Sequence, residues 1–166
     1  MQIRITRRRT VVLCLAVLVV AGAFFWDHMV VTEEERIETV IEEAALALER
    51  NDLDTCLTYL DEDCRLMGRP VKSLRKLLEE AIKSYPLKEA DPYGIDVTLD
   101  EENPNRARAK VVSAVILRDY GEERKIDWKL EFVRHDDHNW RLTNITPYFH
   151  KSREQIFLTQ LEWLLR

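Results

Sequence analysis

The sequence predicts an α+β fold, in which three helices precede a curved antiparallel sheet, behind an N-terminal segment suited to a membrane. Three observations lead to this prediction. Apolar residues recur at helical spacing from Thr32 to Tyr85, and they alternate with polar residues from Asp91 to Thr146. An uncharged run of sixteen residues extends from Val11 to Trp26. The two periods distinguish helices from half-buried strands, and the uncharged run is typical of membrane segments and secretion signals.

The charge of the chain is divided unevenly along its length. The 166 residues include 25 Lys and Arg against 30 Asp and Glu, which gives a net charge of −5. Four arginines precede the uncharged run, and every acidic residue lies at Asp27 or beyond. The remainder carries 21 basic and 30 acidic residues, a net charge of −9. Because a body this acidic lacks the basic footprint of a nucleic-acid-binding domain, we expect no nucleic-acid partner.

The uncharged run is interpreted as one transmembrane helix over residues 10–31, behind a basic tail over residues 1–9. Sixteen helical residues reach about 24 Å, and the flanking residues extend this towards the roughly 30 Å of a bilayer core. Trp26 stands where interfacial aromatic residues occur. The arginines that favour a cytoplasmic N-terminus are Arg7, Arg8 and Arg9.

This topology predicts a single-pass protein of a bacterial inner membrane, with its domain on the periplasmic side. The alternative is a secretion signal, because a basic start and a short apolar region precede Ala21-Gly22-Ala23, a small-residue pattern that suits cleavage. An uncleaved signal would anchor the chain in the same way, whereas a cleaved one would release the domain.

The first half of the domain contains three predicted helices. Thr32 followed by Glu33 to Glu35 resembles a capped helix start, since acidic residues in the first turn suit the helix dipole. A second, shorter apolar stripe runs from Leu53 to Leu60, and a third helix would start at Ser73 and end before Pro86. The apolar face of the first helix consists of Ile37, Val40, Ile41, Ala44, Ala45 and Leu48.

The second half alternates between apolar and polar residues, as strands with one buried face do. The final strand is expected over Trp140 to Thr146, before Pro147. One apolar face is formed by Ile95, Val97, Leu99, Val111, Val115, Leu117, Ile126, Trp128, Leu130, Phe132 and Leu142. The polar residues in register with it are Ser113, Asn144 and Thr146. The three helices are expected to cover this face.

Two stretches resemble the NTF2-like (SnoaL-like) superfamily. The helix pair in Ala45–Asp63 is similar to the opening helices of that superfamily, and Trp140–Thr146 is similar to its last strand. The order of elements agrees from about Glu33 to Tyr148, within a domain predicted over residues 32–148. The resemblance implies a curved sheet wrapped round helices into a cone, often dimeric. It also implies a cavity that some members use for catalysis and many use for binding or assembly.

The residues of the predicted inner face favour a binding cavity over a catalytic one. Catalytic members of the superfamily place ionisable side chains inside the cone, and no acid or histidine falls on this face. We therefore expect no catalytic residue, metal or cofactor. The candidate cavity residues are Tyr59, Tyr93, Ser113, Trp128, Phe132 and Asn144. If the domain were an isomerase or dehydratase, Tyr59, Tyr93 and Asn144 would be the candidates.

Cys56 and Cys64 both face inward by periodicity. Outside the cytoplasm they could form a disulfide, and the alternative is two buried free thiols. The sequence leaves both possibilities open.

The end of the chain predicts an amphipathic helix over residues 149–166, in which Ser152 and Gln155 form a capping-box pattern. Such a helix must bury its apolar side, either on its own cone or on a partner. The candidate partner-contact residues are Ile156, Phe157, Leu161, Trp163 and Leu164.

Together these features predict a non-catalytic, membrane-anchored accessory or scaffold subunit. Its expected partners are the membrane, through the N-terminal helix, and either other subunits of a membrane complex or a second copy. The alternatives are a module that binds a small apolar ligand in the cone and an enzyme of the SnoaL-like kind.

Overall fold

A computed structural model of the chain describes residues 31–84, 86–118 and 123–157. The predicted N-terminal tail and most of the predicted anchor, with Arg7, Arg8, Arg9 and Trp26, lie outside these ranges. Within them, no helix is both long and apolar enough to cross a membrane. The helices are α2 (Glu33–Glu49), α3 (Leu53–Thr58) and α4 (Val71–Ser84). The strands are β1 (Leu60–Leu66), β2 (Arg69–Pro70), β3 (Leu87–Leu99), β4 (Arg106–Leu117), β5 (Glu123–Arg134) and β6 (Trp140–Phe149).

The helices largely follow the predicted pattern. Helix α2 begins directly after Thr32, and its buried face consists of Ile37, Ile41, Ala44 and Ala47. The second apolar stripe is shorter than predicted, because Leu60 already belongs to β1.

The start of α4 differs from the prediction, which made Ser73 the cap. The helix begins at Val71, so Ser73 lies in its first turn. There the Ser73 hydroxyl donates a hydrogen bond to the carbonyl of Pro70, at 2.7 Å. Pro70 therefore immediately precedes the helix, where its missing N–H costs nothing.

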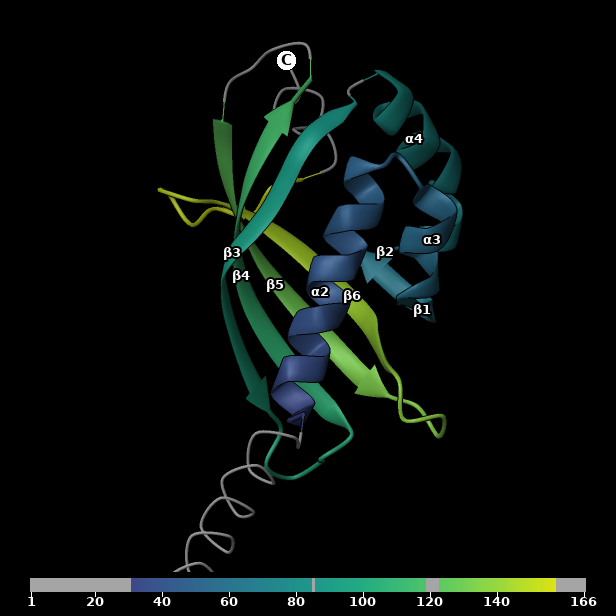
Figure 1. Cartoon of the computed structure of the whole chain (residues 1–166), viewed down its shortest axis with the longest axis vertical. Coiled ribbons are helices and arrows are strands. Elements are labelled where there is room, and N and C mark those ends of the chain that lie inside the picture. The colour runs from purple at the N-terminus through teal and green to yellow at the C-terminus, as the bar shows by residue number, and fades with distance from the viewer. Residues whose placement is uncertain (1–30, 85, 119–122, 158–166) are drawn as a thin grey trace, which may run out of the picture. The chain divides into compact units, whose positions relative to one another are not determined.

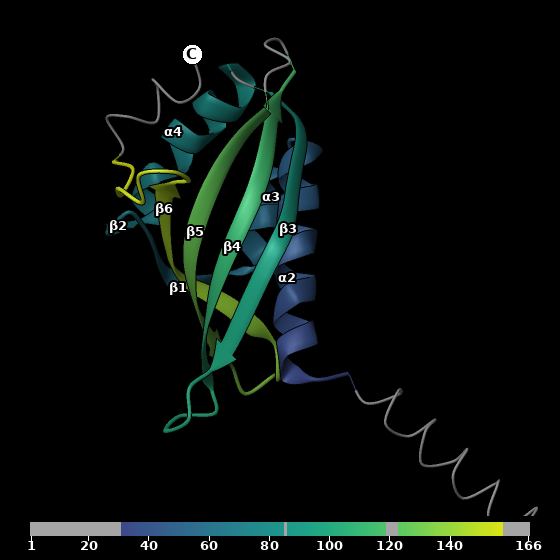
Figure 2. The same cartoon turned by 90° about the vertical axis from the view of Figure 1, so that its left-hand side faces the viewer.

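The six strands form one sheet in the order β2-β1-β6-β5-β4-β3. The prediction of a wholly antiparallel sheet is wrong in one place, because β1 and β6 pair in parallel. These two strands lie at opposite ends of the domain sequence, so they are not joined by a hairpin that would make them antiparallel. Figures 1 and 2 show the sheet curving around α2, with α3 and α4 grouped beside β1 and β2.

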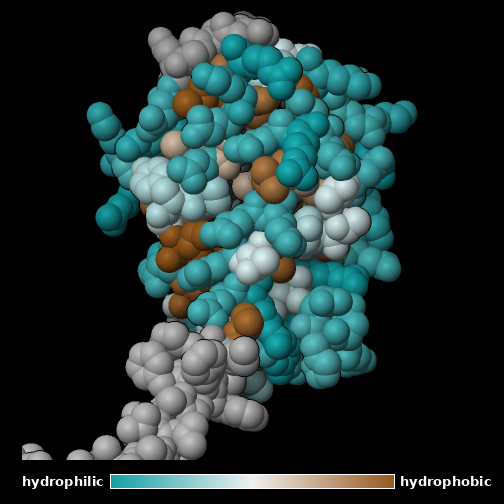
Figure 3. Space-filling model, viewed as in Figure 1, coloured by the Kyte–Doolittle hydropathy of each residue, from teal (hydrophilic) through white to brown (hydrophobic). Residues whose placement is uncertain are grey.

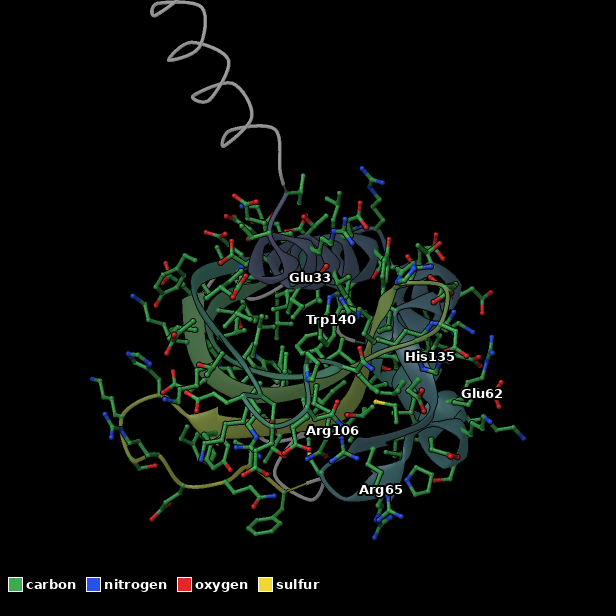
Figure 4. All side chains as sticks on the ribbon, turned by 90° about the horizontal axis from the view of Figure 1, so that it is seen from below. Glu33, Glu62, Arg65, Arg106, His135 and Trp140 are labelled. Carbon is green, nitrogen blue, oxygen red and sulfur yellow. The ribbon has the colours of Figure 1, made fainter. Side chains whose placement is uncertain are left out.

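The main core fills the space between α2 and the inner face of this sheet. It includes Ile37 and Ile41 of α2, Ala107 and Ala109 of β4, and Phe132 of β5. Figure 4 looks along the domain from the end where α2 begins, and it shows Trp140 inside, while Glu62 and Arg65 lie on the outside. Burial alternates along the first part of β4 and in the second half of β5, which confirms the predicted apolar inner face of these two strands.

Strand β6 contains a β-bulge, which reverses the inward direction predicted for the side chains of Asn144 and Thr146. Phe132 pairs with Leu142, but the preceding residue, Glu131, pairs with Asn144, so Thr143 is an extra residue. An extra residue interrupts the alternation of side chains between the two faces. Beyond the bulge, Ile145 therefore takes an inner position and Asn144 an outer one. The strand also continues through Pro147 to Phe149 rather than ending before the proline.

The predicted C-terminal helix is wrong over its first part. Residues 150–157 contain no helix, and Gln155 forms an isolated antiparallel bridge with Tyr148. The N–H of Ile156 donates to the carbonyl of Pro147, at 2.9 Å. This return of the chain competes successfully with helix formation because it buries Ile156, which is 2% exposed. The predicted contact residues Leu161, Trp163 and Leu164 lie outside the described residues.

Candidate functional site

A cavity of about 310 Å³ lies inside the cone, between α2 and the inner face of the sheet. Part of its wall consists of small side chains. Ala44 and Ala45 line it from α2, and Ala90 lines it from β3. Larger apolar side chains complete the wall from β4, β5 and β6, including Val115, Ile126, Trp128 and Ile145, which are half-buried. The cavity therefore has an almost wholly apolar wall.

The cavity wall contains one polar pair. The indole N–H of Trp128 donates a hydrogen bond to the hydroxyl oxygen of Ser113, at 2.7 Å. Ser113 is 7% exposed, and it is the one buried polar or charged residue in the described part of the chain. A serine hydroxyl can both donate and accept a hydrogen bond, and in this pair its oxygen accepts.

The other polar groups of the wall are Arg124 and Cys56. Arg124 is half-buried and already engaged by another group of the chain. Burial raises the pKa of the Cys56 thiol to about 11. Among the described residues that line the cavity there is no Asp, Glu or His. The described part of the wall thus offers none of the histidine or carboxylate side chains that most often serve in general acid–base catalysis.

Cys64 lies in the main core, and both Cys56 and Cys64 are buried free thiols. Of the two possibilities that the sequence left open, the structure has the unbridged one. Burial, together with the charge of the nearby Asp61, raises the pKa of Cys64 to about 12. Both thiols are therefore protonated at neutral pH, and a protonated thiol is a poor nucleophile.

Two of the six predicted cavity residues, Ser113 and Trp128, line the cavity. Phe132 is 2% exposed and belongs to the main core instead. Tyr59 packs on a smaller cluster formed by Ala44, Ala47 and Cys56. Burial raises the pKa of the Tyr59 hydroxyl, as does its hydrogen bond with Glu43.

Tyr93 and Asn144 lie away from the cavity. Tyr93 is 50% exposed, and the amine of Lys125 stands 5.3 Å from the centre of its ring. Asn144 was predicted to face inward, but the bulge at Thr143 turns it outward, and Ile145 and Pro147 line the cavity in its place. These two residues therefore offer no inward-facing group for catalysis.

Several residues that line the cavity could not be identified from the sequence. Leu87, Ala90 and Pro92 lie in the first half of β3, where two register shifts break the alternation that would reveal an inner face. Ile156 also lines the cavity, and its place depends on the return of the chain after β6. For α2, in contrast, the helical period did indicate that Ala44, Ala45 and Leu48 share one face.

The turn between β5 and β6 is rich in potential metal ligands but is held by local contacts. The imidazole of His135 contacts the carboxylate of Asp61, at 2.7 Å. Asp137 accepts hydrogen bonds from the side chain and backbone of Asn139, which lower its pKa. Within the described ranges, no group of three or more His, Cys, Asp or Glu side chains is arranged to hold a metal ion.

No protein-family model and no curated protein sequence matches the chain. Solved structures do resemble it. A protein of unknown function with a cystatin-like fold from Nostoc punctiforme superimposes with a TM-score of 0.61 at 13% identity, covering 75% of this chain and 97% of that one. A candidate ketosteroid isomerase from Parabacteroides distasonis gives 0.58 at 16% identity, covering 73% and 90%.

A third structure, an NTF2-like protein of unknown function from Shewanella baltica, gives a TM-score of 0.53 at 13% identity, covering 72% of this chain and 95% of that one. At these identities the similarity concerns the fold, and a fold of this kind supports many activities. The curved mixed sheet, the helices on its inner face and these similarities lead to one conclusion: the chain has the NTF2-like fold.

Proposed function

We propose that the domain is a non-catalytic binding module that holds a small apolar ligand in its cavity. The observation that carries this proposal is the apolar wall of about 310 Å³, with the Ser113–Trp128 pair as a polar feature. Ligand sites are typically concave and mainly apolar, with a few polar groups that orient the ligand. The volume lies near the lower end of the usual range of about 300–1,000 Å³, which favours a small ligand.

The chemistry of the wall supports binding over catalysis. A serine nucleophile needs an adjacent base, and Ser113 accepts from an indole N–H rather than donating to a histidine or carboxylate. The raised pKa of Cys56 keeps the thiol that lines the cavity protonated. The wall can therefore stabilise a bound ligand by excluding water from apolar surface. This contributes about 25 cal/mol of binding free energy per Å² of apolar surface buried.

The Trp128 indole provides a local test of this proposal. We expect 1-hexanol, a small neutral apolar probe, to shift the Trp128 indole N–H resonance saturably in full-length protein held in lipid nanodiscs. A Trp128→Phe variant assigns the resonance. Ala45→Phe should fill the cavity and weaken the apparent affinity by at least about tenfold, since an overpacked site leaves no room for the probe.

Thr39→Phe is the matched control for this experiment, because Thr39 is exposed on the same helix and lies outside the cavity wall. It should leave hexanol binding unchanged. The proposal is wrong if the wild-type resonance does not respond, or if Ala45→Phe binds the probe as well as the wild type does.

We also propose that the chain is tethered to the inner membrane, with its domain on the periplasmic side. The support is the uncharged run from Val11 to Trp26 and the arginines that precede it. In spheroplasts, added protease should digest the domain while a cytoplasmic protein survives. Protection of the domain until the membrane is lysed would contradict this topology.

A second candidate function is assembly with other subunits of a membrane complex or with a second copy. It is favoured by Phe157, which is 57% exposed beside the buried Ile156. A photo-crosslinking residue at Phe157 should yield one adduct of defined mass in membranes, whereas the same residue at Glu101 should not. Equal adducts at both positions would indicate random contact.

A further inference from the structure

A second hollow, of about 370 Å³, adjoins the apolar cavity on the side where α2 faces β3. Helix α2 contributes Glu42, Leu46 and Glu49 to it, and β3 contributes residues 89–92. Ala90 and Pro92 line both the hollow and the cavity. The acidic hollow, as we call it, is therefore the polar neighbour of the apolar cavity. Figure 3 shows the face with α2 and β3, where apolar side chains are visible among hydrophilic ones.

Four carboxylates line the acidic hollow: Glu42, Glu49, Glu89 and Asp91. Glu49 has a structural partner, since its carboxylate accepts a hydrogen bond from the backbone N–H of Ala90, at 2.7 Å. This bond joins α2 to β3 beside the cavity. Glu42 and Glu89 are exposed, and both face solvent around the hollow.

The described lining of the acidic hollow is unbalanced in charge. No Lys or Arg belongs to the described residues that line it. Arg124 lines the apolar cavity instead and is already engaged by another group. An acidic surface by itself would be a solvated face. This acidic surface differs because it adjoins the apolar cavity. A ligand with its apolar part inside the cone would place its other end among these carboxylates.

We propose that the ligand of the cavity is a cationic amphiphile, with an apolar body that enters the cone and an amine that remains in the acidic hollow. This inference rests on the proposed function, and it specifies the charge of the ligand. A cleft lined by charges of one sign attracts ligands of the opposite sign and repels those of the same sign. The site therefore discriminates against fatty acids and other anionic amphiphiles of the same shape.

Three probes of equal chain length test this selectivity: hexylamine, 1-hexanol and hexanoate. Each is titrated at pH 7 into full-length protein in lipid nanodiscs, with the Trp128 indole resonance as the readout. We expect hexylamine to bind about fivefold more tightly than hexanol, which is the most that one solvent-exposed ion pair contributes. Hexanoate should bind more weakly than hexanol, and added salt should reduce both differences.

The carboxylates are tested with the double variant Glu42→Gln and Glu89→Gln, which leaves the Glu49–Ala90 bond in place. It should bring the affinities for hexylamine and hexanoate towards that for hexanol and leave hexanol unchanged. The matched control removes two charges in the turn beyond β3, with Glu101→Gln and Glu102→Gln, and should keep the wild-type preference.

The outcomes separate this inference from the proposed function. If hexanol binds but hexylamine has no advantage, or if the Glu42 and Glu89 variant keeps the preference, the charge inference is wrong and the apolar site stands. If none of the three probes shifts the Trp128 resonance, both proposals are wrong.

Discussion

Ser113 is a polar residue in an apolar wall, and its hydroxyl has a structural task. It accepts the indole N–H of Trp128, at 2.7 Å. In Ser113→Ala the indole loses this acceptor at a partly buried position, so we expect the free energy of unfolding to fall by about 1 kcal/mol. Urea unfolding followed by tryptophan fluorescence measures this loss. Ser113→Thr, which keeps a hydroxyl and suits a strand, is the control, and equal stability of wild type and Ser113→Ala would contradict the assignment.

Cys56 and Cys64 make the stability of the domain sensitive to alkaline pH. Burial raises the pKa of both thiols from 9.0, to about 11 for Cys56 and about 12 for Cys64. A raised pKa means that the folded state retains protons that the unfolded chain loses. The stability that depends on keeping both buried thiols protonated is therefore fully present below pH 9. It is lost as the pH rises through 9 towards 11 and 12.

We expect the free energy of unfolding to fall between pH 9 and 11 by up to about 1.4 kcal/mol per pH unit for each thiol. Chemical denaturation at a series of pH values measures this slope. The double variant Cys56→Ala and Cys64→Ala should be less stable at pH 7 but have a flatter profile. Cys14→Ser should keep the wild-type slope, and an unchanged slope in the double variant would contradict burial as the cause.

Individual side chains show where sequence periodicity succeeds. Trp128 and Ser113 were placed correctly because β4 and β5 pair without a register shift, so the alternation holds along both strands. Asn144 was placed wrongly because one extra residue at Thr143 reverses the faces beyond it. A bulge arises from pairing with a neighbouring strand, and pairing is not visible in the residues of one strand alone.

At the scale of elements, α2 is the helix that closes the cone. Ile37 is fully buried on its inner side, whereas Leu46 is 42% exposed. Ile37→Ala should lower the free energy of unfolding by about 2–5 kcal/mol, because it opens a void in the main core. Leu46→Ala on the same helix should change it by less than about 0.5 kcal/mol. Thermal and urea unfolding compare the two variants, and similar losses would show that α2 packs by a different face.

The bounds of the elements were less predictable than their existence. Strand β3 begins at Leu87, although alternation is clear only from Ile95, since register shifts lie near Lys88 and Tyr93. The parallel pairing of β1 with β6 could not be predicted either. It depends on the meeting of segments that are about eighty residues apart in the chain, and short apolar runs do not specify their neighbours.

At the scale of the whole molecule, the periods of the sequence were sufficient for the α+β class because they fix which faces are apolar. Three amphipathic helices followed by half-apolar strands have few ways to bury those faces in one domain of this size. The same reasoning explains how structures with 13–16% identity share the architecture. The cavity was only partly predictable, because its wall includes small residues from segments far apart in the chain, Ala44 and Ala45 of α2 and Ala90 of β3.

The return of the chain after β6 makes the last described residues part of the domain. Ile156 is 2% exposed, lines the cavity and hydrogen-bonds to Pro147. A chain that ends after Ser152 loses this side chain and opens the cavity to water. We expect it to lose about 2–5 kcal/mol of stability, as removal of a buried isoleucine side chain typically does. Calorimetry and urea unfolding would measure the change.

The comparison that isolates Ile156 is a chain that ends after Phe157. It keeps the bridge between Gln155 and Tyr148 and the buried Ile156, so we expect it to be more stable than the chain that ends after Ser152 by about 2–5 kcal/mol. Ile156→Ala in the full chain should reproduce most of the loss seen on ending after Ser152. If both truncated chains were equally stable, Ile156 would not hold the cone closed.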